Sequence, residues 1–121
     1  MPKVVTDMTT QCEAFRKGAS YFRRGNFREA VVQFTLALSL QSNRLDILDG
    51  RATALHRLGK EEAARADARQ MILCDPGDPR GYLRLGRLFA MSGRIGEARQ
   101  TYERGLGAAR AAHPLQSVRR H

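Results

Sequence analysis

Three arginines, Arg80, Arg84 and Arg87, have the spacing in this sequence that most clearly suggests chemistry. They follow one another at intervals of four and three residues, which places them on one side of an α-helix. Guanidinium groups in such a stripe bind carboxylates or phosphates through charge-assisted hydrogen bonds. The alternative is a solvated helix face whose arginines pair loosely with Asp78 and Asp46, and each such pair contributes less than about 1 kcal/mol. We expect the stripe to contact a partner.

No other group of residues has a spacing that suggests catalysis or metal binding. Cys12 and Cys74 are far apart, and neither has a Cys or His nearby that could share a metal ion. The three histidines are interpreted as surface or chain-end residues. The segment 59–63, GKEEA, lacks the upstream glycine and the Ser or Thr of a phosphate-binding loop. We therefore expect no enzyme activity, no catalytic residues, no metal site and no cofactor.

The chain carries a positive charge that is concentrated in its last third. Its 121 residues include 21 Lys and Arg against 12 Asp and Glu, for a formal net charge of +9. Residues 78–121 contribute nine of the basic and three of the acidic side chains. The length and the hydrophobic content of 42% predict one folded domain. Isolated cysteines, with no signal sequence and no membrane span, favour an intracellular protein, nuclear or cytoplasmic, without a membrane partner.

An internal repeat with a period of 34 residues organises the sequence. Five sets of positions hold similar residues at this interval in three units. They are Gly18, Ala52 and Gly86; Tyr21, Leu55 and Phe89; Gly25, Gly59 and Gly93; Ala30, Ala64 and Ala98; and Phe34, Ala68 and Tyr102. Because five coincident columns are hard to obtain by chance, the sequence predicts three copies of one structural unit.

Each unit is predicted to form two helices joined by a tight turn. Apolar and small residues recur at three- and four-residue spacing, and a glycine separates the two periodic segments. Small residues are required where helices cross at about 8–10 Å, and an aromatic residue fills the space beside them. The segment Phe27–Leu40 is the most apolar, so we expect it to lie deep between its neighbours. Asp78 is predicted to cap the helix that follows it.

These columns resemble the tetratricopeptide repeat, which combines Leu-Gly and Tyr in its first helix with Ala, an aromatic and a small residue in its second. The resemblance covers about residues 11–110 and weakens in the second unit, where Ala68 and Met71 replace the aromatic and the small residue. It is strongest in the third unit, at Tyr82, Leu85, Gly86, Phe89, Ala98, Tyr102 and Gly105. The resemblance implies an all-α fold, a right-handed superhelix of three helix-turn-helix repeats with six to seven helices.

The predicted domain spans residues 10–113. Its repeats cover about 11–44, 45–78 and 79–112, between a flexible N-terminus at 1–9 and a basic C-terminal tail at 114–121. Repeat arrays usually end in a polar capping helix. Here, either the last helix runs on through Ala112, or an apolar face of the third unit is left open and pairs with another copy of the chain.

The resemblance implies that partners bind on the concave surface formed by the first helix of each repeat. The repeat register places the peptide-binding candidates there: Phe15, Ala19, Phe22, Arg57, Arg80, Leu83, Arg84 and Arg87. They predict an extended or helical partner segment with apolar anchors near the first unit and acidic residues near the third. Phe15 and Phe22 are equally well explained as core residues, because aromatic residues at seven-residue spacing often pack inside.

Co-chaperone domains of this class hold a C-terminal Asp carboxylate pair with a clamp of five residues. The matching positions here are Phe15, Ala19, Gly50, Arg80 and Arg84, and only the two arginines keep the required chemistry. Each lost charge-assisted hydrogen bond costs roughly 1.5–3 kcal/mol. The loss of three predicts no specific recognition of a chaperone tail. A co-chaperone-like adaptor with an altered clamp is the alternative within this class.

A second resemblance concerns residues 75–106, DPGDPRGYLRLGRLFAMSGRIGEARQTYERGL. This run is similar to the third repeat at the N-terminus of fungal F-box proteins that carry leucine-rich repeats, although co-chaperones share part of it. The resemblance implies the front segment of a nuclear ubiquitin-ligase adaptor that is tethered to replication proteins.

A different class of function is open to so basic a chain. The third unit could bind nucleic acid non-specifically, with an affinity that falls steeply as salt rises. The sequence contains no recognised nucleic-acid motif, so we keep this function as the alternative to peptide binding.

Overall fold

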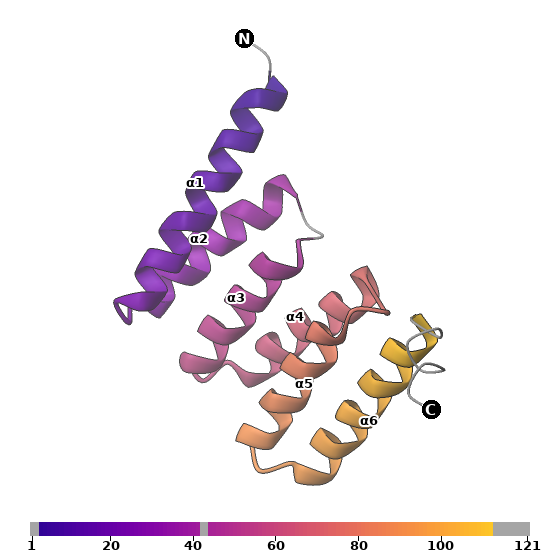
Figure 1. The fold of residues 1–121 in the computed structure, drawn as a ribbon. Helices are drawn as coiled ribbons and strands as arrows, with labels where there is room; N and C mark the ends of the chain where they lie inside the picture. Colours follow the sequence, from indigo (N-terminus) through magenta and orange to yellow (C-terminus); the bar gives the residue numbers. More distant parts are fainter. Residues whose placement is uncertain (1–2, 42–43, 113–121) are drawn as a thin grey trace.

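The computed structural model describes residues 3–41 and 44–112, which form six α-helices arranged as three helix pairs (Figure 1). The helices are α1 (Lys3–Arg23), α2 (Phe27–Leu40), α3 (Leu45–Arg57), α4 (Glu61–Cys74), α5 (Pro79–Met91) and α6 (Ile95–Ala112). No strand occurs in the described ranges. The all-α fold predicted from the 34-residue period is confirmed.

The helix pairs stack in chain order, with α1 and α2 at one end and α5 and α6 at the other (Figure 1). Helix α3 contacts both helices of the first pair, and α5 contacts both helices of the second pair. The first helices of the pairs therefore touch one another, whereas α2, α4 and α6 make no mutual contacts within the described part of the chain. Because the helices converge on one side only, the array is curved, and α1, α3 and α5 line its inner side.

Each pair turns at a glycine with a left-handed backbone. Gly25, Gly59 and Gly93 have φ values of 82°, 80° and 79°, a conformation that glycine adopts without steric cost. After each glycine, the next backbone N–H donates to a carbonyl five residues earlier, at 2.9 Å in all three turns. One sequence column therefore builds the same turn three times.

Small residues lie where the helices approach most closely, as predicted. A Cβ atom added to Gly18 would lie 2.7 Å from a ring carbon of Phe34, and one added to Gly50 would lie 2.9 Å from the same ring. Phe34 comes from α2 and is only 2% exposed, so its ring packs against both α1 and α3. In the third unit, a Cβ at Gly86 would overlap the ring of Tyr102.

The second unit obtains its bulk from other positions. Its equivalent of Phe34 is Ala68, which is fully buried and leaves the helices without an aromatic wedge. Ile47 and Met71 are instead among the largest fully buried side chains of the described residues. Gly81 of α5 accommodates this packing, because a Cβ there would lie 3.1 Å from the Cβ of Met71. The departures from the repeat pattern therefore change the packing without removing a helix.

Two expectations about α1 and α2 need correction. Helix α1 begins at Lys3, inside the segment 1–9 predicted to be flexible, because no proline or glycine between Lys3 and Lys17 interrupts it. Helix α2 is not buried on all sides, since Val32 is 60% and Leu36 43% exposed. They face outward because α2 packs against α1 and α3 on one side only.

The far end of the stack combines features of the two predicted alternatives, because a long last helix is present and Leu106 on it is still 58% exposed. Helix α6 continues through Ala112 and, at 18 residues, is longer than α2 or α4, which have 14 each. The predicted tail at 114–121 lies outside the described residues. Among the six helices, none combines the length and the apolar character needed to span a membrane.

Candidate functional site

All eight residues predicted to bind a peptide lie on α1, α3 and α5, the helices of the inner side. Four of them are exposed to solvent: Arg57, Arg80, Leu83 and Arg87. The other four are half-buried: Phe15, Ala19, Phe22 and Arg84. The inner side therefore presents a cationic surface on α5 and an aromatic surface on α1.

Asp78 fixes the start of α5 and holds Arg80 beside it. The Asp78 carboxylate accepts a hydrogen bond of 2.9 Å from the backbone N–H of Arg80, and a second of 2.8 Å from its guanidinium group. These bonds hold the pKa of Asp78 below its ordinary value, chiefly through the side-chain hydrogen bond from Arg80. The predicted cap is confirmed. The Arg80 side chain remains 58% exposed, so solvent or a ligand can reach it.

Arg84 joins α5 to α3 through a carboxylate on the inner side. Its Nε donates to Asp49 Oδ1 at 2.6 Å, and its Nη2 donates to Oδ2 at 3.3 Å. The Arg84 side chain is 17% exposed. The partner expected from the sequence, Asp46, is bound instead to Arg44 at 2.6 Å. The stripe is therefore not uniformly free: Arg84 is neutralised within the fold, whereas Arg87 has no ion-pair partner in the described ranges.

Phe22 and Arg57 both contact Phe27, near the first two turns. The rings of Phe22 and Phe27 are 5.2 Å apart and arranged edge to face. The guanidinium carbon of Arg57 lies 5.2 Å from the centre of the Phe27 ring, a cation–π geometry. Arg57 forms no ion pair within the described ranges, so its N–H groups can still donate to a carboxylate.

Phe15 takes part in both the core and the inner surface. Its ring centre is 5.9 Å from that of Phe34, and its exposed side lines a hollow of about 330 Å³. The other lining residues are Gln11, Cys12, Arg16 and Arg44. Phe15 is therefore packed against the core and also accessible from the inner side, and its part in peptide binding stays a prediction.

Two charged residues of this surface, Asp49 and Arg44, are absent from the predicted set. Asp49 occupies the same repeat position as Phe15 and Leu83, so its place on the inner side follows from the register. The position of Arg44 follows less directly, because it precedes α3 and has no helical register of its own.

Among the described residues, the histidine and cysteine side chains form no recognisable reactive site, and His113 and His121 lie outside these residues. His56 is half-buried rather than fully on the surface, and its Nδ1 atom lacks a hydrogen-bond partner. Cys12 is exposed and Cys74 half-buried, both as free thiols. No group of three or more metal-ligating side chains is found among the described residues.

Three stacked helix pairs, a 34-residue set of packing columns and an inner side built from the first helices are the architecture of the tetratricopeptide-repeat fold. A solved structure supports this class: the first TPR domain of Spaghetti (RPAP3), bound to the HSP90 peptide SRMEEVD, superimposes with a TM-score of 0.73 at 25% identity. The match covers 83% of this chain and 79% of that one. The chain therefore has the tetratricopeptide-repeat fold.

Curated relatives agree with the class but are much longer than this chain. The F-box/TPR repeat protein pof3 of Schizosaccharomyces pombe is 31% identical over 103 residues, which cover 84% of this chain and 18% of the relative. The Hsp70-Hsp90 organizing protein of Triticum aestivum is 33% identical over 94 residues, covering 78% of this chain and 16% of the relative. Comparison with protein-family models gave no match.

Proposed function

We propose that the inner side of this domain binds a partner segment that carries both acidic and apolar residues. Acidic residues would contact the α5 end, and apolar residues would pack near Phe15 and Phe22. The domain would act as a non-catalytic interaction module. The proposal depends on one observation above all: Arg80, Leu83 and Arg87 are exposed on α5, one of the helices of the inner side.

The free cations on this face favour a ligand with few acidic groups. Among the described residues, Arg80 forms an ion pair only with Asp78, the N-cap residue of the same helix. A ligand carboxylate can accept hydrogen bonds from the remaining donors of the guanidinium group. Leu83 is 45% exposed on the same helix, where it also lines the groove between α5 and α6, and it can contact an apolar side chain. Asp49 occupies Arg84, so the face offers fewer free cations than the three-arginine stripe suggested.

A co-chaperone-like adaptor is the alternative within this class, and the solved relative bound to SRMEEVD makes it specific. At the clamp positions, Gly50 offers no side-chain donor and backs onto the ring of Phe34, while Phe15 and Ala19 also lack donors. We therefore expect SRMEEVD to bind at least tenfold more weakly here than to a domain with a complete clamp, because a single lost charge-assisted hydrogen bond suffices for that factor.

The similarity to pof3 supports a more specific setting. We propose that the domain is the partner-recruiting front segment of an F-box ubiquitin-ligase adaptor that acts in the nucleus on replication proteins. The inner side would then recruit a replication protein, not a chaperone tail. Recovery of a chaperone and no replication protein in an affinity capture from nuclear extract would contradict this setting.

A selection from a displayed library of 12-residue peptides tests the proposed ligand class. We expect enriched sequences to combine acidic residues with Phe or Leu, and the affinities of the resulting peptides can be measured by fluorescence anisotropy. Arg80→Glu with Arg87→Glu should weaken binding at least tenfold, and it leaves the Arg84–Asp49 pair intact. Enrichment of peptides without acidic residues would contradict the proposal.

A matched control separates a local site from general attraction. Arg69→Glu with Arg99→Glu makes the same change in net charge on the exposed surface of α4 and α6. We expect this variant to keep the peptide affinity. Non-specific nucleic-acid binding would instead weaken in both variants, and its logarithm would fall linearly with the logarithm of salt concentration. Equal losses in the two variants would therefore favour the nucleic-acid alternative.

A second candidate function, self-association, is favoured by an open groove at the far end of the stack. The groove lies between α5 and α6 and has a volume of about 280 Å³. Leu106 lines the groove and is 58% exposed. Leu38, which occupies the equivalent position two repeat periods earlier, is 7% exposed because the following helix pair covers it. We propose that the same face of a second copy covers this groove.

Sedimentation velocity across concentration and salt tests the self-association. Arg104, whose guanidinium carbon is 5.9 Å from the ring centre of Tyr82 in the groove, would face its own copy across the interface. Salt should therefore strengthen the dimer by screening this repulsion. Leu106→Lys should abolish the dimer, and Leu73→Lys, on α4 and 73% exposed, should not. A monomer under all conditions would exclude the proposal.

A further inference from the structure

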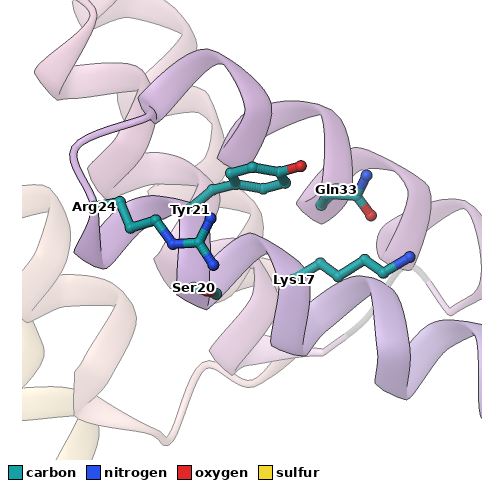
Figure 2. A pocket seen from close by; sticks show the side chains of 5 residues that line it. All are labelled: Lys17, Ser20, Tyr21, Arg24 and Gln33. Carbon is teal, nitrogen blue, oxygen red and sulfur yellow. The ribbon is translucent and has the colours of Figure 1, made fainter.

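The outer face of the first helix pair holds a hollow that the proposed peptide surface does not use. It lies between α1 and α2, has a volume of about 220 Å³, and is lined by Lys17, Ser20, Tyr21, Arg24 and Gln33. Figure 2 shows the Arg24 guanidinium beside the Tyr21 ring, and the Lys17 side chain extending along α1 below Gln33. Every one of these side chains carries a group that can donate a hydrogen bond.

The repeat register shows that this face differs from its equivalents in the other pairs. Ser20 corresponds to Ala54 and Leu88, which are 0% and 1% exposed. Leu88 packs with Leu55, Ala64 and Ala68 of the preceding pair, so in the third unit this position is an internal contact. In the first unit the same position is half-buried and polar. The outer face is therefore suited to polar contacts and not to another apolar helix pair.

The hollow lacks the carboxylate that is present at the equivalent position of the second unit. Lys17 occupies the same repeat position as Arg51, and Gln33 the same position as Asp67. In the second unit, Arg51 Nε and Nη2 donate to the two Asp67 oxygens, each at 2.8 Å. The first unit keeps the cation and replaces the carboxylate with an amide.

Neither cation of the hollow is paired with a carboxylate of the described residues. Across the described ranges, Lys17 and Arg24 form no ion pair within 4.0 Å. Two acidic residues lie one turn away on the same helices, Glu13 before Lys17 and Glu29 before Gln33. Both are exposed and neither lines the hollow. The hollow thus carries two uncompensated positive charges beside neutral hydrogen-bond donors.

We propose that this hollow binds an oxyanion from a partner protein, taking the place that the Asp67 carboxylate fills in the second unit. Lys17 and Arg24 supply the charge, and the Ser20 hydroxyl and the Gln33 amide supply neutral donors. The oxyanion is either the carboxylate of an acidic side chain or the phosphate of a phosphorylated one, which share this chemistry. Because the hollow is on the outer side, a partner can occupy it while a peptide lies on the inner side.

NMR titration of the ¹⁵N-labelled chain tests the site at physiological salt. The probes are inorganic phosphate, a short Glu-rich peptide, and the same peptide with phosphoserine in place of its central Glu. We expect saturable shifts of backbone amides in 17–24 and 30–34 with all three probes. Tighter binding of the phosphopeptide identifies the source as a phosphorylated partner, and tighter binding of the Glu peptide identifies an acidic one.

Three variants decide whether the shifts report this site. Gln33→Asp supplies the missing carboxylate from within, so it should reduce the affinity at least tenfold while raising the melting temperature. Lys17→Gln with Arg24→Gln should reduce the affinity by a similar factor. Arg69→Gln with Arg99→Gln, an equal change in charge elsewhere, should leave it unchanged. Unaltered affinity in Gln33→Asp, or equal losses in all variants, would overturn the proposal and leave only non-specific anion binding.

Discussion

Replacing Asp67 by Ala should destabilise the domain more than any exposed charge substitution. Arg51 and Asp67 form a bidentate pair whose side chains are 25% and 8% exposed, and Arg51 also donates to Thr35 of α2 at 3.2 Å. The pair therefore connects α3 to α4 and to the preceding helix pair. The hydrogen bonds that Arg51 donates to Asp67 raise the pKa of Arg51 above its ordinary value, chiefly through the side-chain hydrogen bond. A guanidinium group is protonated at neutral pH even without such a partner, so Arg51 stays charged when Asp67 is removed.

The loss of unfolding free energy in Asp67→Ala depends on the charge that remains on Arg51. Breaking a fully buried ion pair costs about 3–5 kcal/mol, because one charge is left without compensation. Here a quarter of the Arg51 side chain is exposed, and water can reach part of the guanidinium group. We therefore expect a loss of about 2–3 kcal/mol. For a domain of this size, such a loss lowers the melting temperature by on the order of 10 °C.

Urea unfolding followed by far-UV circular dichroism measures this loss. Glu97→Gln is the control, because its pair with Arg94 is about half exposed on both sides and should contribute roughly 0.2–1 kcal/mol. Arg51→Leu with Asp67→Thr installs the residues that the third unit carries at the same positions, Leu85 and Thr101. This double variant should recover at least half of the stability lost in Asp67→Ala. A loss in Asp67→Ala no larger than that in Glu97→Gln would refute the reasoning.

Two further predictions concern helix packing and capping. Gly86→Ala should cost about 1–3 kcal/mol of unfolding free energy, because its Cβ would overlap the Tyr102 ring. Gly107→Ala, where a Cβ meets no atom within 4 Å, should stabilise α6 by up to about 1 kcal/mol in the same urea assay. Removing the cap in Asp78→Ala should cost about 1 kcal/mol at neutral pH. Because the folded pKa of Asp78 is lowered, its contribution is present above the unfolded pKa of about 3.9. It is lost as pH falls through the lower folded value, so wild type and Asp78→Ala should converge in acid and a constant difference would count against the cap.

The periodicity of the sequence was sufficient to predict the fold because each column has a direct steric cause. The turn glycines adopt positive φ in all three units, and Gly18 and Gly86 face aromatic rings as the crossing geometry requires. These features are local to one helix pair, so a single unit contains all the information they need. The length of α1 was harder to predict, because the repeat register begins only at residue 11 and gives no reason for the helix to extend earlier.

The details of the inner surface depend on how neighbouring pairs are rotated against each other. Asp46 and Asp49 are both on α3 and both on its inner side, yet only Asp49 reaches Arg84. Asp46 is three residues earlier and turns toward Arg44. The sequence register places all of these residues on one surface, but the rotation that selects the partner is set by packing between pairs. Eight candidate residues could therefore be assigned to the inner side, while their ion pairs could not.

Differences between equivalent positions of the three units indicate where contacts with other molecules are to be expected. Arg51 in the middle unit has its carboxylate within the fold, whereas the equivalent Lys17 has only a neutral amide opposite it. Leu38 is covered by the next helix pair, whereas the equivalent Leu106 is 58% exposed. In both comparisons the residue inside the stack, Arg51 or Leu38, is paired or covered by other residues of the chain. The equivalent residue at the end of the stack, Lys17 or Leu106, has the same charge or apolar character without that partner. Because an unpaired cation is stabilised by pairing with an anion and an exposed leucine by burial against apolar groups, the two ends of the stack offer different surfaces, one to anions and one to apolar groups.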